Sequence, residues 1–210
     1  VKLYVPRGNY KMVAIAAATD KPSEDNKVSI KSKTEVVFPK NVVTDMFYTY
    51  QDIAVKDREE SQNYDCILKR GVTVLQLDSR SEIRPDYIKS FKCTITGNCG
   101  NVFDPSTGHC LQPATLTKTY DISGDRFKAK RFLFTIYFFL GADDVTDITL
   151  TTQSTDTEDK VAKDLSFENV HMVKGKMTIY KGPFLSTHSS ASFIIDSPTI
   201  PDSGFSTEFE

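Results

Sequence analysis

The segment from Phe132 to Leu140, with the sequence FLFTIYFFL, most constrains what this chain can fold into. Its nine residues include no charged side chain, and only Thr135 and Tyr137 carry a polar group. Aromatic and β-branched residues favour a strand over a helix. Nine residues are also far fewer than the roughly 20 that a membrane-spanning helix needs. The segment is therefore predicted to be a central strand of a β core.

Both faces of this predicted strand are mostly apolar, because side chains alternate between the two faces of a strand. One face carries Phe132, Phe134, Ile136, Phe138 and Leu140, and the other carries Leu133, Thr135, Tyr137 and Phe139. An ordinary sandwich strand has one face in water. We expect the first face to pack on the opposite sheet of its own domain. The second face should be buried from outside that sheet pair, by another domain or by a strand of a partner.

The rest of the chain has the pattern of short strands separated by polar turns. No window of 11 residues sustains the apolar spacing of an amphipathic helix. Segments such as Met46–Val55 and Val72–Leu77 are rich in aromatic and β-branched residues instead. A short polar turn joins residues 64–79 to Tyr87–Gly97, which favours an antiparallel pair. The sequence therefore predicts an all-β, mainly antiparallel fold of β-sandwich type.

The chain of 210 residues is long enough for one large β domain or for two of about 100 residues each. Residues 98–114 are rich in Gly, Asn, Pro, Ser and Thr, which favours a boundary there. We expect an N-terminal domain of residues 1–112 and a C-terminal domain of residues 113–210 with an extended tail. The first ten residues, VKLYVPRGNY, are typical of the middle of a strand pair, so the first domain is expected to be trimmed at its start.

The composition argues against two classes of protein. The formal net charge is −2, whereas a nucleic-acid-binding protein usually presents a basic face. No run of 18 apolar residues is present, so no transmembrane span is predicted.

The four cysteines, Cys66, Cys93, Cys99 and Cys110, leave the disulfide state open. Cys93 and Cys99 lie in one strand-like run and would be about 20 Å apart in it, too far to pair. A bond between Cys99 and Cys110 would close a loop. The alternative is four reduced thiols.

No residue pattern typical of a catalytic or metal site is present. The three histidines lie far apart and outside metal-binding spacings. Cys99, His109 and Cys110 are close in sequence, but their spacing matches no structural zinc pattern. Asp143 and Asp144 are adjacent and are expected to lie in a solvated turn, because neighbouring residues at a strand end point apart. We therefore predict a protein that is not an enzyme and has no cofactor and no metal site.

Residues 168–186, with the sequence ENVHMVKGKMTIYKGPFLS, resemble the C-terminal segment of the fimbrillin-type proteins of anaerobic Bacteroidetes. In that family a strand of the form N-V-P-x-x-R-N-x-x-T-x-I-x-G-x-x-L-T recurs. The positions that fit it are Asn169, Val170, Thr178, Ile179, Gly182, Leu185 and Ser186. The family's Pro, Arg and Asn are replaced by His171, Lys174 and Gly175. Upstream, VPRGNYKMVAIA resembles the family's P-x-G-x-Y hairpin, and MFYTYQDIAV followed by LKRGVTVLQLDS resembles its L-x-R-x-V-A-x-L strand pair.

The resemblance implies two tandem transthyretin-like β-sandwich domains in a non-catalytic subunit or anchor of a fimbria. It implies a location at the cell surface, in the outer membrane or the fimbrium, with a lipid anchor upstream of residue 1. It also implies other fimbrial subunits as partners, through insertion of an extended strand from one protein into another, a form of β-augmentation.

Two further expectations come from the residues themselves. Phe205 and Phe209 are candidate partner contacts, because two aromatic residues in an otherwise polar tail have little local reason to be there. The alternative function is a surface glycan-binding β-sandwich module, and the absence of Trp, which would supply an aromatic platform, counts against it.

Overall fold

The computed structural model describes residues 4–18, 27–38, 42–56, 62–186 and 193–196. Regular structure in these ranges consists of strands β1 to β16 and one short 3₁₀ helix, η3, at Asp125–Phe127. The described strand pairs are antiparallel except for β15 with β6. The prediction of an all-β, mainly antiparallel fold is therefore confirmed.

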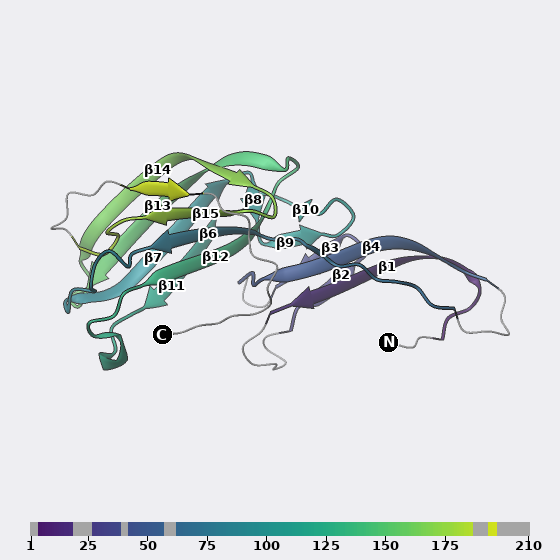
Figure 1. The fold of residues 1–210 in the computed structure, drawn as a ribbon, viewed down its shortest axis with the longest axis horizontal. Coiled ribbons are helices and arrows are strands. Elements are labelled where there is room, and N and C mark those ends of the chain that lie inside the picture. Colours follow the sequence, from purple (N-terminus) through teal and green to yellow (C-terminus); the bar gives the residue numbers. More distant parts are fainter. Residues whose placement is uncertain (1–3, 19–26, 39–41, 57–61, 187–192, 197–210) are drawn as a thin grey trace.

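Two sheets face each other in the larger part of the molecule, on the left of Figure 1. The first has the strand order β11–β7–β13–β14, with bounds Leu116–Asp121, Ile88–Gly97, Val145–Asp156 and Val161–Val173. The second has the order β16–β15–β6–β12–β8, with bounds Ile194–Asp196, Met177–Lys181, Thr73–Asp78, Leu133–Leu140 and Cys99–Gly100. Buried side chains of both sheets form what we call the sandwich core, which includes Leu75, Phe91, Ile95, Phe134, Phe138 and Leu150.

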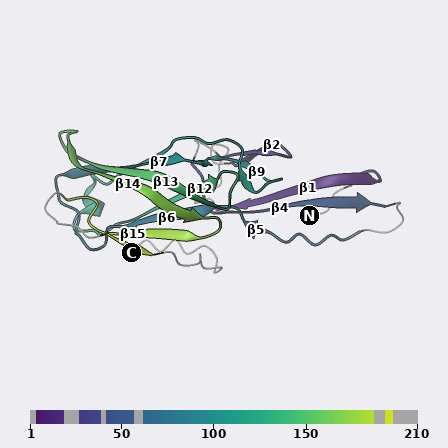
Figure 2. The ribbon, with the colours of Figure 1, turned by 90° about the horizontal axis from the view of Figure 1, so that it is seen from above.

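Two smaller sheets form the other part of the molecule. One has the order β1–β4–β5, with bounds Gly8–Ala17, Met46–Val55 and Lys69–Arg70. The other has the order β10–β9–β3–β2, with bounds His109–Cys110, Val102–Asp104, Glu35–Val37 and Ser29–Ser32. A second core lies here, formed by Val36, Phe38, Val43, Met46, Tyr48, Val72, Phe103, Cys110 and Phe139. Figure 2 shows β1 and β4 extending away from the sandwich as a long ribbon.

The predicted boundary between residues 112 and 113 falls in the segment that joins β10 to β11. Strand pairing crosses it, because β6 and β7 precede this point and pair with β11, β12, β13 and β15, which follow it. The presence of two core clusters fits a tandem arrangement. The division into residues 1–112 and 113–210 stays a prediction.

The apolar segment that dominates the sequence forms β12, as predicted. It pairs with β6 over six residues, and Phe134, Ile136, Phe138 and Leu140 lie in the sandwich core. On its other face, Phe139 is fully buried in the second core, so that end of the face is covered by the other part of the molecule. The expectation of burial is wrong for Leu133, which is 42% exposed.

The antiparallel pair predicted for residues 64–79 and 87–97 does not form. The two segments supply β6 and β7, which belong to opposite sheets of the sandwich. The connection between them crosses from one sheet to the other and is held by the buried guanidinium of Arg84, which donates to the carbonyl oxygens of Phe127 and Ile88. A short polar turn is compatible with either arrangement, and here the partners available in each sheet decide between them.

Candidate functional site

Strands β11 and β12 are consecutive in the chain but lie in opposite sheets, and each has an open edge. β11 pairs with β7 on one side, and within the described ranges no strand pairs with its other side. β12 pairs with β6 over Leu133–Phe138, while β8 covers its opposite side at Phe139 and Leu140. The described part of the chain therefore leaves the outer edge of most of β12 without a strand partner.

Side chains of β11 reach across to this edge of β12. The carbonyl oxygen of Thr135 accepts a hydrogen bond from the Lys118 Nζ at 3.0 Å and another from the Tyr120 hydroxyl at 2.9 Å. A buried or half-buried carbonyl needs a donor when no neighbouring strand supplies one. These two bonds hold the two open edges side by side without joining them into one sheet.

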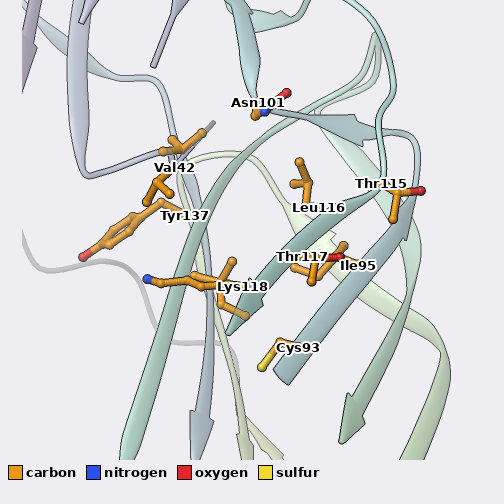
Figure 3. A pocket seen from close by; sticks show the side chains of 11 residues that line it. Val42, Cys93, Ile95, Asn101, Thr115, Leu116, Thr117, Lys118 and Tyr137 are labelled. Atoms are coloured by element: carbon orange, nitrogen blue, oxygen red, sulfur yellow. The ribbon is translucent and has the colours of Figure 1, made fainter. Parts of the chain in front are cut away.

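A pocket of about 290 Å³ lies between the two edges (Figure 3). Its lining includes Cys93, Ile95 and Ile136 of the sandwich core and residues of the edge strand β11. The second core closes it through Val43 and the partly buried Tyr137. The complete lining is Val42, Val43, Cys93, Ile95, Asn101, Thr115, Leu116, Thr117, Lys118, Ile136 and Tyr137.

The strand register explains why these side chains converge. Across the β11–β7 pair, Leu116 lies opposite Ile95, Lys118 opposite Cys93, and Tyr120 opposite Phe91. Ile95, Cys93 and Phe91 are all buried. Every second residue of β11 therefore points inward, and Lys118 is the charged member of this otherwise apolar or aromatic row.

Burial governs the protonation of the groups around the pocket. It raises the pKa of the Cys93 thiol to about 12 and raises the pKa of the Tyr120 and Tyr137 hydroxyls, so these groups are neutral at pH 7. Burial lowers the pKa of Lys118 from its usual value, because removal from water penalises the ammonium form. Lys118 is the one cation among the lining residues, and the lining contains no carboxylate.

The residues considered as catalytic or metal ligands do not form such a site. His109 Nε2 lies 3.5 Å from Asp144 Oδ1 and 3.3 Å from Lys174 Nζ, in a small ionic contact between β10 and the loops that follow β12 and β14. Cys99 and Cys110 are buried free thiols. Across the residues that the structure describes, no group of three or more His, Cys, Asp and Glu is arranged to hold a metal ion, and no helix is long and apolar enough to cross a membrane.

The segment that resembles the fimbrillin pattern serves packing. Val170 is fully buried, and Thr178 donates its hydroxyl to the carbonyl of His171. The carboxylate of Glu82 positions the residues after Gly182. It accepts hydrogen bonds from the backbone N–H groups of Leu185 at 2.7 Å and Ser186 at 3.0 Å. This motif therefore closes the sandwich and lies outside the pocket.

Sequence reasoning missed the pocket and the role of Lys118. One signal was available: in the run LTKTY, Lys118 shares a strand face with Leu116 and Tyr120, which marks a cation on an inward face. The two predicted contact residues, Phe205 and Phe209, lie outside the described residues.

Comparison with known proteins adds the family. Residues 1–180 match the family model Mfa2, described as fimbrillin-A associated anchor proteins Mfa1 and Mfa2. No curated protein sequence matches the chain. Two similar solved structures are candidate adhesins, one from Bacteroides ovatus at 13% identity with a TM-score of 0.49, covering 78% of this chain and 66% of that chain. The other, from Bacteroides thetaiotaomicron, has 13% identity and a TM-score of 0.45, covering 92% of this chain and 77% of that chain.

This chain spans 66% of the length of the Bacteroides ovatus structure, which is just under two thirds. The family match covers most of the chain, from residue 1 to Tyr180 in β15. The chain belongs to the family of fimbrillin-A associated anchor proteins Mfa1 and Mfa2.

Proposed function

We propose that this chain is a structural subunit or anchor of a cell-surface fimbria, and that it accepts an extended strand of a neighbouring subunit between β11 and β12. Membership of an anchor-protein family makes it a non-catalytic structural protein associated with fimbriae. Its partners are accordingly other fimbrial proteins. The strand insertion is the finer part of the proposal, and it is supported by the geometry of the two open edges.

The observation that carries this proposal is a pocket flanked by two strand edges that have no strand partner within the described ranges. In β-augmentation the main chain of the edge supplies hydrogen bonds and side-chain pockets set the register. β11 offers its open edge over Leu116–Asp121, and β12 offers Leu133–Phe138. The pocket of about 290 Å³ between them is large enough to take a side chain of the inserted strand.

Filling the pocket tests strand insertion. Leu116 lines the pocket and is partly buried, so Leu116→Trp should occupy the space that an incoming side chain needs. Leu111→Trp is the matched control, because Leu111 is 46% exposed and does not line the pocket. The measurement is the yield of SDS-resistant higher-mass species that contain the full-length chain, recovered from the surface of the cells that produce the fimbria.

We expect Leu116→Trp to lower this yield at least several-fold while Leu111→Trp leaves it unchanged, with both variants unfolding at the wild-type denaturant midpoint. Strand insertion at this site is refuted if the folded Leu116→Trp protein assembles with the wild-type yield.

The tail and the membrane attachment belong to the same proposal. Phe205 and Phe209 are proposed to contact the partner, and replacing both by Ala should reduce co-assembly while Thr207→Ala does not.

Outer-membrane attachment through a lipid upstream of residue 1 is proposed from the sequence resemblance. Incorporation of labelled palmitate into the full-length precursor would support it, and a precursor that never incorporates lipid would exclude it. The glycan-binding alternative stays a prediction, without an observation that favours it.

A further inference from the structure

Lys118 is a partly buried cation for which the structure supplies only neutral partners in the ranges it describes. Its Nζ donates to the Thr135 carbonyl at 3.0 Å and lies 4.9 Å from the centroid of the Tyr120 ring. The other titratable groups near it, the Cys93 thiol and the hydroxyls of Tyr120 and Tyr137, are protonated at neutral pH because burial raises their pKa. No ion pair between Lys118 and a carboxylate is present among the described residues.

The surroundings of Lys118 contrast with those of other cations in the molecule. Arg70 pairs with Asp45 at 3.0 Å, Arg80 with Asp78 at 2.8 Å, and the partly buried Lys174 with Asp144 at 3.2 Å. Lys163, whose pKa burial also lowers, donates to two backbone carbonyls at 2.6 and 2.7 Å. Lys118 donates to one backbone carbonyl and faces the pocket. The remaining N–H donors of its ammonium group are therefore hydrogen-bonded to water in the isolated chain.

A strand seated between β11 and β12 would remove this water. Burying an ammonium group without a compensating partner is strongly unfavourable, as is removing one member of a buried ion pair. An incoming strand with an uncharged side chain at this point would therefore bind weakly. A strand with a carboxylate at the same point would form a charge-assisted hydrogen bond, which is roughly twice as strong as a neutral one.

We propose that the strand inserted between β11 and β12 carries an aspartate or glutamate that pairs with Lys118. This inference rests on the proposed strand insertion and names the chemistry of the partner. Side chains of a strand point to the same face at every second position. The acidic residue is therefore flanked, two positions away on either side, by apolar residues that pack toward Leu116, Ile95 and Ile136.

A purely structural role for Lys118 is the competing interpretation, because its bond to Thr135 helps to hold the two edges together. The two roles differ in what they predict. A structural role lowers the stability of the isolated chain when Lys118 is replaced. If Lys118 pairs with a partner carboxylate, its replacement lowers assembly. A reagent that joins amines directly to carboxylates then also cross-links Lys118 to the partner.

The test uses carbodiimide cross-linking of the assembled full-length protein, followed by peptide mass spectrometry. A carbodiimide activates a carboxylate, which forms an amide with a neighbouring lysine amine on loss of one water. We expect a cross-link from Lys118 to an Asp or Glu in an alternating apolar sequence of another polypeptide, and none from Lys118 in the unassembled chain. Lys89, which pairs with Asp159 at 2.7 Å, should cross-link in both samples and serves as the internal control.

Three substitutions complete the test. Lys118→Met should lower the assembled fraction by at least about tenfold, since it leaves the partner's carboxylate buried and unpaired. Lys118→Glu should lower it further through like-charge repulsion, and Lys118→Arg should retain most of it. The denaturation midpoint of each isolated variant shows whether folding is affected.

The outcomes separate this inference from the proposed function. If Leu116→Trp blocks assembly while Lys118→Met assembles like the wild type and no Lys118 cross-link forms, strand insertion stands and the acidic partner residue is refuted. If Leu116→Trp assembles normally, strand insertion at this site fails. If a Lys118 cross-link leads to a residue of the same chain, the occupant is an intramolecular segment and the proposed partner is overturned.

Discussion

The ring of Phe139 packs against the ring of Phe103, with the two centroids 4.7 Å apart. Phe139 belongs to β12 of the sandwich, whereas Phe103 belongs to β9 of the smaller sheets, and both are fully buried. The adjacent residue Phe138 points the other way into the sandwich core. One strand therefore supplies side chains to both cores and joins the two parts of the molecule.

Replacing Phe139 by Ala is expected to destabilise the protein by about 3–5 kcal/mol, because it opens a cavity where Phe38 and Phe103 now pack against the ring. Urea unfolding measures the change. Leu133→Ala on the same strand face is the control and should cost less than about 1 kcal/mol, since Leu133 is 42% exposed. Equal effects of the two substitutions would contradict the assignment of Phe139 to a buried junction.

Arg84 is expected to be essential for the crossover between β6 and β7. It is 3% exposed, and its guanidinium donates to the carbonyls of Phe127 and Ile88. Arg84→Met removes these donors and should cost about 1–3 kcal/mol for each carbonyl left unsatisfied. Arg126→Met is the matched control, because Arg126 is exposed and stacks over the Phe127 ring, which contributes about 0.5–1 kcal/mol. A thermal or urea midpoint of Arg84→Met close to that of Arg126→Met would exclude this role.

Stability should fall as the pH is lowered from about 7 to 5, through His109. Burial lowers the pKa of His109 below its usual 6.5, and the nearby Lys174 ammonium adds to this effect, whereas Asp144 and Asp143 oppose it. The unfolded chain therefore binds a proton more readily than the folded one once the pH drops below 6.5, and folding loses stability down to the folded-state pKa.

His109→Asn removes this titration and should flatten that part of the pH dependence. Urea unfolding at pH 7.5 and pH 5.5 compares the two proteins. If the free energies of unfolding of wild type and variant change in parallel over this interval, His109 does not contribute.

The four cysteines are expected to differ sharply in reactivity. Cys66 is exposed, whereas Cys93, Cys99 and Cys110 are buried free thiols, and burial raises the pKa of Cys93 and of Cys99 to about 12. A maleimide reagent should label one thiol in the native protein, lost in Cys66→Ser, and four in denaturant without a reductant. Labelling of only two thiols in denaturant would indicate a disulfide, with Cys99–Cys110 as the pair to examine first.

The sequence predicted the class of fold and the strand β12 well, because both depend on local composition. A run such as Phe132–Leu140 has no stable alternative to a buried strand, and an alternating pattern reports the faces of a strand directly. The partner of each strand was less predictable. The turn between β6 and β7 has the residues of a tight connection, yet the strands separate into two sheets, where β6 pairs with β12 and β7 pairs with β13.

The candidate site likewise depends on the choice of strand partners, which local sequence does not reveal. β11 and β12 follow each other in the chain with η3 between them, and local sequence does not reveal that they pair with β7 and β6 instead of with each other. This separation creates the two open edges, the pocket and the half-buried position of Lys118. The row Leu116, Lys118 and Tyr120 carried the signal that a cation points inward, but not what surrounds it.

The amino-acid sequence by itself therefore determined that this chain is all-β, that β12 lies at its centre and that the chain resembles a family of fimbrial proteins. These properties follow from side-chain type and alternation, which act within a few residues. Tertiary structure alone decided that Phe139 and Phe138 enter different cores and that Lys118 faces a pocket without a described carboxylate beside it. Such relationships depend on contacts between strands far apart in the chain, and these are selected by the burial of the whole molecule.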